Sequence, residues 1–324
     1  MANGGVTALV AGLAVACASG AALAQDAFPS RPVQFVVAYS PGTGADILAR
    51  MLGPKLAERW KASVVTENRV GATGTIASAL VAKAPPDGHT LLFIATSFGT
   101  TPALRRNLPF DPVKSFAPVA LFATSGLGVV VHPQLPVKTL RDFINLAKRR
   151  PGDLHYSSPG VGGPQHLSME LLKLETGINI VHVPYKGFAG AIADAMAGHV
   201  QAMVSALQSA HPHVTSGRLR MLAVMSGARS TAFPAVPTMK EMGLPALEIY
   251  TWYGSFAPAG TPAGVVTRIN ADMNELLREP DVRTAMSRMG MDVAGGPPER
   301  LGDLVKRELP RWQRVVKAAG IQAR

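Results

Sequence analysis

The chain has 324 residues, of which 47% are hydrophobic, and its 32 Lys and Arg against 21 Asp and Glu give a net charge of +11. This length allows two domains with separate hydrophobic cores. The 32 glycines and 26 prolines follow no fixed period, which excludes a collagen-like chain and indicates many turns. The basic residues are dispersed and lack interleaved aromatic residues for base stacking, so we expect no nucleic-acid partner.

The first 24 residues differ from the rest of the chain. They carry no charged side chain and run apolar from Val6 to Leu23. They end in Ala22-Leu23-Ala24, a small-x-small sequence of the kind that signal peptidase cleaves. We therefore expect residues 1–24 to be a signal peptide and the mature protein to lie outside the cytoplasm. An uncleaved membrane anchor, or lipidation at Cys17, is the alternative.

Beyond residue 24 the chain begins with an alternation of strands and helices. Apolar runs predict strands at 33–39, 63–66 and 90–95. Helices are expected over 47–56 and 75–83, between these strands. This order of elements indicates a parallel sheet covered by helices.

A second alternation follows the long apolar segment 119–131. The expected elements are helices at 140–149, 165–176 and 191–198 and strands at 155–157, 178–183, 200–205 and 220–226. Segment 250–257 is a second candidate to cross between the two parts, and the chain from residue 262 onward is expected to be helical. Two such modules joined by two extended segments predict a hinged pair of α/β lobes.

The two crossing segments define the expected domains. Lobe 1 comprises residues 25–124 and 252–324, and lobe 2 comprises residues 125–251. Ligands of parallel sheets bind beyond the carboxyl ends of the strands, and pockets form at domain interfaces. We therefore expect a ligand site between the lobes.

Several loops at strand ends have the composition of a ligand site. Loop 40–46 offers successive backbone N–H groups and a helix N-terminus, which binds a carboxylate without a basic side chain. Loop 157–165 also leads into a helix N-terminus, and its three glycines leave the backbone N–H groups uncovered. The ligand-binding residues predicted from these loops are Ser40, Pro41, Gly42, Thr43, Gly44, Asp46, Thr96, Ser97, Ser158, Gly160, Gly163, Gln165, Tyr185 and Lys186. For Asp46, capping of the helix is the alternative.

Two motifs imitate enzymes. Gly42-Thr43-Gly44 imitates a dinucleotide-binding fingerprint, but Ile47 occupies the third glycine position. Ser40 stands at a strand-to-helix turn like a hydrolase nucleophile, although almost nothing precedes its strand. We expect no enzymatic activity and no cofactor, and keep a secreted serine hydrolase that uses Ser40 as the alternative function. His211-Pro212-His213 is expected in a surface loop, without a metal.

A series of motifs resembles one known family. They run in this order: Ser40-Pro41-Gly42-Thr43-Gly44-Ala45-Asp46, Glu67-Asn68-Arg69, Ala84-Pro85-Pro86-Asp87-Gly88, Val181-His182-Val183-Pro184-Tyr185-Lys186-Gly187 and Trp252-x-Gly254. In sequence and order they resemble the Bug family, the extracytoplasmic receptors of tripartite tricarboxylate transporters. The resemblance implies a Venus-flytrap fold similar to type II periplasmic binding proteins. It also implies a monomer that delivers its ligand to the membrane subunits of such a transporter, or that is read by a sensor protein.

The resemblance also implies the kind of ligand, a di- or tricarboxylate, an acidic amino acid or an aromatic acid. In the family, the loop that corresponds to residues 41–46 holds one end of the ligand through backbone amides and hydroxyls. Thr43 replaces a glycine of that loop, and Ser205 stands where the family often has an Asp or Asn after the strand. Ser205 therefore joins the predicted ligand-binding residues.

Overall fold

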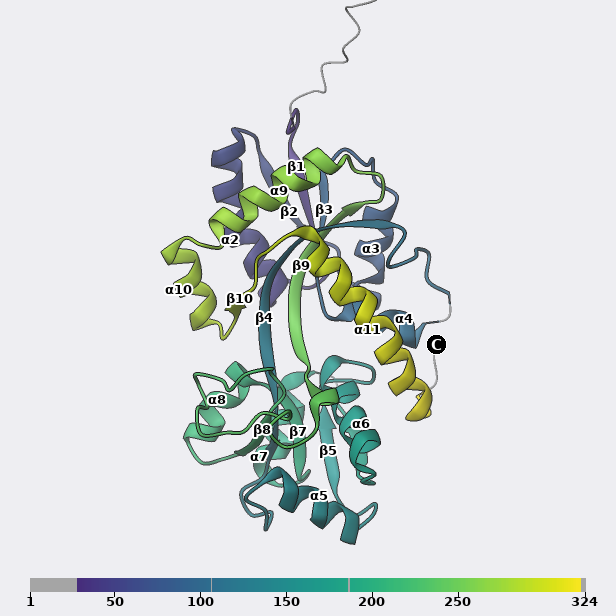
Figure 1. The fold of residues 1–324 in the computed structure, drawn as a ribbon, viewed down its shortest axis with the longest axis vertical. Helices are drawn as coiled ribbons and strands as arrows, with labels where there is room; N and C mark the ends of the chain where they lie inside the picture. The colour runs from purple at the N-terminus through teal and green to yellow at the C-terminus, as the bar shows by residue number, and fades with distance from the viewer. Residues whose placement is uncertain (1–27, 106, 186, 322–324) are drawn as a thin grey trace, which may run out of the picture.

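The computed structural model describes residues 28–105, 107–185 and 187–321. Two α/β lobes lie one above the other and are joined by two long strands (Figure 1). The two-lobed fold predicted from the sequence is confirmed. The predicted signal segment 1–24, with Cys17, lies outside the described residues. Within the described ranges no helix has both the length and the apolar character needed to span a bilayer.

Lobe 1 is built on a parallel sheet with the strand order β2-β1-β3. Its first elements are β1 (Val33–Val37), α2 (Gly44–Trp60), β2 (Val64–Asn68), η1 (Ala72–Gly74), α3 (Thr75–Ala82), β3 (Thr90–Ala95) and α4 (Ser97–Leu104). Helix α9 (Ala263–Leu276) lies with α2 over Phe35 on one face, and α3 covers Val36 on the other. The strands read as continuous apolar runs because both faces of the sheet are buried.

Two strands carry the chain between the lobes. β4 (Phe116–Val131) pairs antiparallel with β9 (Tyr250–Pro258), from Phe116 opposite Pro258 to Gly126 opposite Tyr250. Beyond Gly126 the same strand pairs with β7 (Ala202–Ala206) and β8 (Arg220–Val224) of lobe 2. One extended sheet therefore runs through both lobes.

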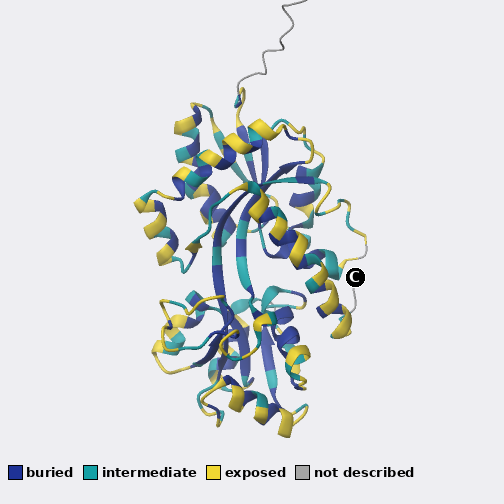
Figure 2. Cartoon of the chain, viewed as in Figure 1, coloured by how far each residue is buried: buried dark blue, intermediate teal, exposed yellow. Residues whose placement is uncertain are grey.

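Lobe 2 repeats the arrangement of lobe 1. Its elements are α5 (Leu140–Arg149), β5 (His155–Ser158), α6 (Pro164–Thr176), β6 (Val181–Pro184), α7 (Phe188–Ala197), β7 (Ala202–Ala206), α8 (Leu207–Thr215), β8 (Arg220–Val224) and η2 (Pro245–Leu247). Strand β5 pairs in parallel with β6 on one side and with β7 on the other. Buried residues gather in separate regions of the two lobes (Figure 2).

Two helices depart from the expectation. The surface loop expected at His211-Pro212-His213 is wrong, because these residues lie inside α8. Proline disfavours a helix interior, but Leu207 and Ala210 of this helix are buried in the lobe 2 core, and their packing outweighs that preference. Helix α4 is not expected from the sequence, since its Gly, Thr and Pro residues show no helical periodicity.

The chain ends with α10 (Pro280–Arg288), β10 (Asp292–Val293) and the long helix α11 (Pro298–Ala318). Helix α11 runs from lobe 1 to the side of α6 in lobe 2 (Figure 1). Its residue Leu301 is buried in lobe 1, whereas Trp312 belongs to the core of lobe 2. The sequence assigns all of 252–324 to lobe 1, but the last turns of this helix pack on lobe 2.

Glu308 lies at the middle of α11 and is only 4% exposed. The indole N–H of Trp252, on β9, donates a hydrogen bond to its Oε2 atom at 2.9 Å. Burial raises the pKa of Glu308 to about 7, although the hydrogen bond from Trp252 and the charge of Arg311 oppose the rise. A titratable carboxyl group is thus buried where α11 passes the crossing strands.

This pKa predicts a pH dependence of stability. An unfolded Glu loses its proton near pH 4.3, so between that pH and about 7 the folded chain holds a proton that the unfolded chain releases. The free energy of unfolding should therefore fall as pH rises, by up to about 1.4 kcal/mol per pH unit. Glu308→Gln keeps a hydrogen-bond acceptor for Trp252 but does not titrate.

Urea unfolding of both proteins at pH 5 and pH 7.5 measures the effect, with the exposed Glu299→Gln as control. Glu308→Gln should gain stability relative to the unsubstituted chain on going from pH 5 to pH 7.5. An equal difference at both pH values would contradict the buried, titrating carboxyl group.

Candidate functional site

Three loops of lobe 1 meet at the carboxyl ends of its parallel strands. The amide of Asn68, at the end of β2, donates to the carbonyl of Tyr39 at 2.9 Å. The Ser97 hydroxyl donates to the carbonyl of Thr73 at 3.2 Å. Because that hydroxyl has one hydrogen, the Tyr39 hydroxyl is the donor in the 2.5 Å bond between the two side chains. The hydrogen-bond chain fixes the loops after β1, β2 and β3 to one another.

Asp46 organises the first of these loops. It is 2% exposed, and its carboxylate accepts hydrogen bonds from the Gly42 amide at 2.9 Å, the Asn68 amide at 2.8 Å and Arg50 Nε at 2.9 Å. Burial opposes ionisation, but the hydrogen bonds from Asn68 and Gly42 and the charge of Arg50 hold the pKa of Asp46 below its ordinary value. The N-cap of α2 is Thr43, so Asp46 shapes the loop that precedes the helix.

Gly42 and Gly44 have different roles in this loop. Gly42 has a φ of +80° and nothing within 4 Å of where a Cβ would lie, so it presents bare backbone to open space. A Cβ at Gly44 would lie 2.6 Å from the ring of Tyr253, on β9. Gly44 therefore allows α2 to begin against the crossing strand. Ser40 and Pro41 are exposed beside Gly42.

Thr96 begins α4 and is 1% exposed. Its hydroxyl accepts a 2.8 Å hydrogen bond from the backbone N–H of Trp252. Thr96 thus ties the end of β3 to β9, while Ser97 joins the hydrogen-bond chain described above. Both predicted residues lie at the expected edge of the sheet and are engaged within lobe 1.

The corresponding loops of lobe 2 also meet. The N–H of Tyr185 donates to the carbonyl of Ser158 at 3.0 Å, and the N–H of Gly187 donates to the carbonyl of Pro159 at 3.0 Å. Gly160 lies beside the carbonyl of Tyr185. The loops after β5 and β6 therefore form one surface, from which Gly163 leads into α6.

The other predicted residues of lobe 2 differ in how far their side chains are buried and hydrogen-bonded. The Tyr185 hydroxyl donates to the Asp194 carboxylate, and this hydrogen bond, with burial, raises the pKa of Tyr185 to about 12. Ser205 is fully buried and donates to the Ala206 carbonyl at 3.2 Å. Gln165 is half-buried in the first turn of α6. Lys186 lies outside the described residues.

Sequence reasoning missed two histidines behind the lobe 2 loop. The N–H of Gly162 donates to Nδ1 of His166 at 2.9 Å, and Ser158 Oγ lies 2.7 Å from Nε2 of His182. Burial lowers the pKa of both imidazoles to about 4, helped by the charge of Lys173 on His166. The sequence could have pointed to these histidines, because each of them lies next to a predicted ligand-binding loop.

The two lobes contact each other at several points besides the crossing strands. A Cβ at Gly162, in lobe 2, would overlap the side chain of Leu104 at the end of α4. Near the crossing strands, the Ser125 hydroxyl contacts Gln208 of α8 at 2.7 Å and the Gly290 carbonyl of lobe 1 at 3.0 Å. Residues 40–46 and 158–163 are therefore borne on lobes that touch on both sides of the crossing strands.

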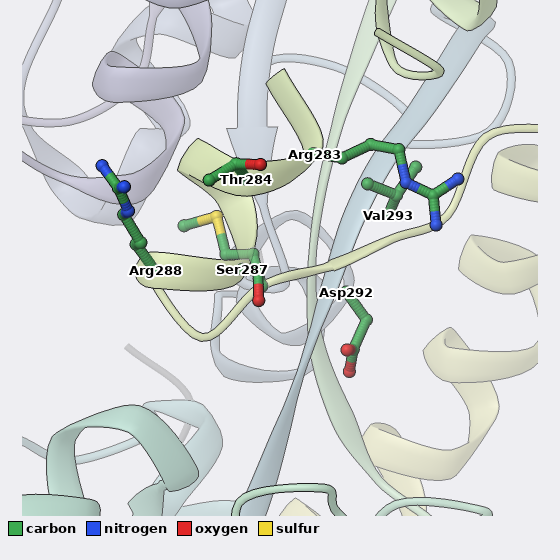
Figure 3. A pocket seen from close by; sticks show the side chains of 7 residues that line it. Arg283, Thr284, Ser287, Arg288, Asp292 and Val293 are labelled. Atoms are coloured by element: carbon green, nitrogen blue, oxygen red, sulfur yellow. The ribbon is translucent and has the colours of Figure 1, made fainter. Parts of the chain in front are cut away.

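Two hollows near α10 compete as candidate sites. One, of about 550 Å³, is lined by α10 and β10, and the guanidinium groups of Arg283 and Arg288 point to opposite sides of it (Figure 3). The other, of about 270 Å³, lies between Gln208 and His211 of lobe 2 and Asp292 of lobe 1. Neither is lined by a predicted ligand-binding residue.

Comparison with known proteins identifies the family. The sequence profile of the tripartite tricarboxylate transporter family receptor matches residues 48–321. The chain belongs to this family. The predicted resemblance to Bug proteins is confirmed by BugT of Bordetella pertussis, which is 34% identical over 314 residues that cover 96% of each chain. The protein is therefore a periplasmic solute-binding receptor of this family.

Two solved structures of Rhodopseudomonas palustris proteins are similar along most of the chain. One, solved with adipate, is 35% identical with a TM-score of 0.76 and covers 91% of this chain and 99% of its own. The other, MatC with bound malate, is 32% identical with a TM-score of 0.73 and covers 89% of this chain and all of its own, 100%. Both neighbours hold a dicarboxylate.

The network around Asp46 gives a first test of the site. Asp46→Asn replaces one carboxylate oxygen, a hydrogen-bond acceptor, by an NH₂ group. That group would then face an N–H donor of Gly42, Arg50 or Asn68. The expected loss is about 1–3 kcal/mol in the free energy of unfolding, as for other buried hydrogen-bonded charges that lose a partner. Denaturant unfolding at pH 7 measures it, with the exposed Asp153→Asn as control. Equal stabilities of the two variants would show that Asp46 does not hold the loop.

Proposed function

We propose that the protein captures a small carboxylate between its lobes and delivers it to the membrane subunits of a tripartite tricarboxylate transporter. The proposal is supported by loops 40–46 and 158–163, one in each lobe, which both lie at the carboxyl ends of parallel strands, lead into a helix and are shaped by hydrogen bonds to a buried side chain. The bound dicarboxylates of two structural neighbours support the ligand class.

The chemistry of the loops suits a ligand with a carboxylate at each end. The first N–H groups of a helix have no acceptor within the helix, and the helix dipole adds partial positive charge there. Helix α2 offers such groups at Gly44 and Ala45. Helix α6 begins with Pro164, which has no N–H, so Gln165 supplies the first free donor of lobe 2. A basic chain further concentrates anions near the site.

The remaining expectations complete the proposal. Residues 1–24 direct export and are removed, lobe 1 comprises 25–124 and 252–324, and lobe 2 comprises 125–251. The mature protein acts as a monomer without cofactor, and Tyr185 and Lys186 contribute to the lobe 2 wall. Candidate ligands are di- and tricarboxylates, acidic amino acids and aromatic acids. A sensor protein that reads the closed form is the alternative partner.

Thermal unfolding with a panel of acids tests the ligand class. Adipate, malate, citrate, glutamate and benzoate represent the candidate classes, and glucose is the neutral control. A ligand at 100 times its dissociation constant stabilises the folded protein by about 2.7 kcal/mol, which gives a visible rise in Tm. At least one acid should raise Tm and glucose should not. A rise with glucose alone would exclude the carboxylate proposal.

A matched pair of glycine variants locates the site. Gly42 and Gly217 both have positive φ, +80° and +72°, and neither has an atom within 4 Å of a Cβ. Valine should therefore strain both backbones to a similar degree. Gly42→Val should abolish the Tm rise caused by the acid, because the branched side chain blocks the bare backbone, and Gly217→Val should retain it. Similar ligand responses in the two variants would remove loop 40–46 from the site.

The hydrolase alternative has a direct test at Ser40. This residue is exposed, and among the described hydrogen bonds none joins its hydroxyl to a histidine. A nucleophilic serine needs such a base within hydrogen-bond reach. We expect no turnover of p-nitrophenyl esters by either the unsubstituted protein or Ser40→Ala. Turnover that disappears in Ser40→Ala would replace the binding proposal by an enzymatic one.

A further inference from the structure

Two imidazole rings lie stacked directly behind the lobe 2 loop. The ring centroids of His166, on α6, and His182, on β6, are 3.9 Å apart with an interplanar angle of 16°. The ring of Tyr156, on β5, is nearly parallel to both, with its centroid 4.8 Å from that of His182 and 6.3 Å from that of His166. Three elements of lobe 2 therefore meet in one aromatic stack, of which His166 is only 3% exposed.

Each imidazole holds one point of the loop. His166 accepts the Gly162 N–H at Nδ1, which requires an unprotonated Nδ1 and places the ring hydrogen on Nε2. The Ser158 hydroxyl donates its single hydrogen to the Gly160 carbonyl at 3.0 Å, so Nε2 of His182 is the donor in the 2.7 Å bond to Ser158 Oγ. The bond from Gly162 requires a neutral His166 ring, whereas His182 can donate from Nε2 in either protonation state.

The charged groups that face the stack are Glu170 and Lys173, both on α6. Glu170 accepts from the Tyr156 hydroxyl at 2.5 Å and from Lys173 Nζ at 2.7 Å. Lys173 also lies over the Tyr156 ring, 5.9 Å from its centroid. The charge of Glu170 favours an imidazolium ion at His182, but burial, the neighbouring His166 and the charge of Lys173 outweigh it and lower the pKa of His182.

We propose that His166 and His182 are positioning residues of the binding site, which as a neutral stacked pair hold residues 158–162 in the shape that receives the ligand. The inference rests on the proposed function for the ligand itself, but the positioning role concerns the free protein. Neither histidine needs to touch the ligand. Each acts through the backbone or hydroxyl group that it holds.

Protonation should release the loop. A proton on Nδ1 of His166 would set two N–H groups against each other at Gly162, and a charge on either ring would oppose one on its neighbour. Because the pKa of both rings is lowered to about 4 from an ordinary value of 6.5, the folded protein resists protonation through that window. Stability contributed by the pair is full above pH 6.5 and is lost as pH falls toward 4.

Isosteric variants test the proposal without a ligand. Asn places an acceptor near the position of Nδ1, so His166→Asn should preserve the bond to Gly162, whereas His166→Leu cannot form it. Hydrogen exchange of the Gly162 amide, followed by NMR at pH 7, should be at least about tenfold faster in His166→Leu than in the unsubstituted protein and His166→Asn. The exposed His199→Leu is the control and should leave this rate unchanged.

Affinity for adipate and malate, measured by calorimetry on the same proteins, completes the test. The dissociation constant of whichever acid binds should rise about tenfold or more in His166→Leu and recover in His166→Asn, in keeping with the loss of one hydrogen bond in the site. If neither acid binds, the choice of ligand fails while the exchange rates still decide the positioning role.

Imidazole ¹⁵N spectra of the unsubstituted protein need no variant and no ligand. Neutral His166 with its hydrogen on Nε2 at pH 7 would support the proposal. A charged ring, a hydrogen on Nδ1, or equal Gly162 exchange in His166→Leu and the unsubstituted protein would overturn it.

Discussion

Pairing of β4 with β9 is the constraint on which the rest of the structure depends. These two antiparallel strands carry the chain from one lobe to the other, and helix α11 also spans both lobes. Tyr253 of β9 packs against the start of α2, and the N–H of Trp252 holds Thr96. On β4, Ser125 bonds to both lobes. A change in the angle between the lobes must therefore be absorbed in this strand pair and in α11, which packs on both cores.

The loops of the two lobes that form the proposed site are stabilised in opposite electrostatic ways. In lobe 1 a charged group, Asp46, collects three donors and is held ionised. In lobe 2 His166, stacked on His182, can accept the Gly162 N–H only when its ring is neutral. Glu308 gives a pH dependence of stability opposite in sign to that of the histidines over an overlapping range, because its pKa is raised and theirs are lowered. A nearly flat pH profile of stability would thus conceal two large, opposed contributions.

Much of the architecture could be predicted from the sequence, because continuous apolar strands alternate with periodic helices. The strand at 90–95 and the helix at 140–149 are found as expected. Helix α8 could not be predicted, since tertiary burial outweighs Pro212, and the attachment of α11 to lobe 2 depends on contacts distant in sequence. The loops of the proposed site were predicted from their composition, but their hydrogen-bond partners could not be predicted. Nothing in the sequence shows that the Asp46 carboxylate accepts a hydrogen bond from the Gly42 N–H, or that two histidines sixteen positions apart stack.

The central claim is that one carboxylate ligand is held by loops of both lobes. The most direct test is an NMR titration of the ¹⁵N-labelled protein with the acid that gives the largest Tm rise, following the backbone amides of Gly44 in lobe 1 and Gly160 in lobe 2. The account predicts that both amides shift along the titration with one common dissociation constant. Shifts confined to one lobe, or shifts centred on the hollow at α10 with Gly44 and Gly160 unmoved, would contradict it.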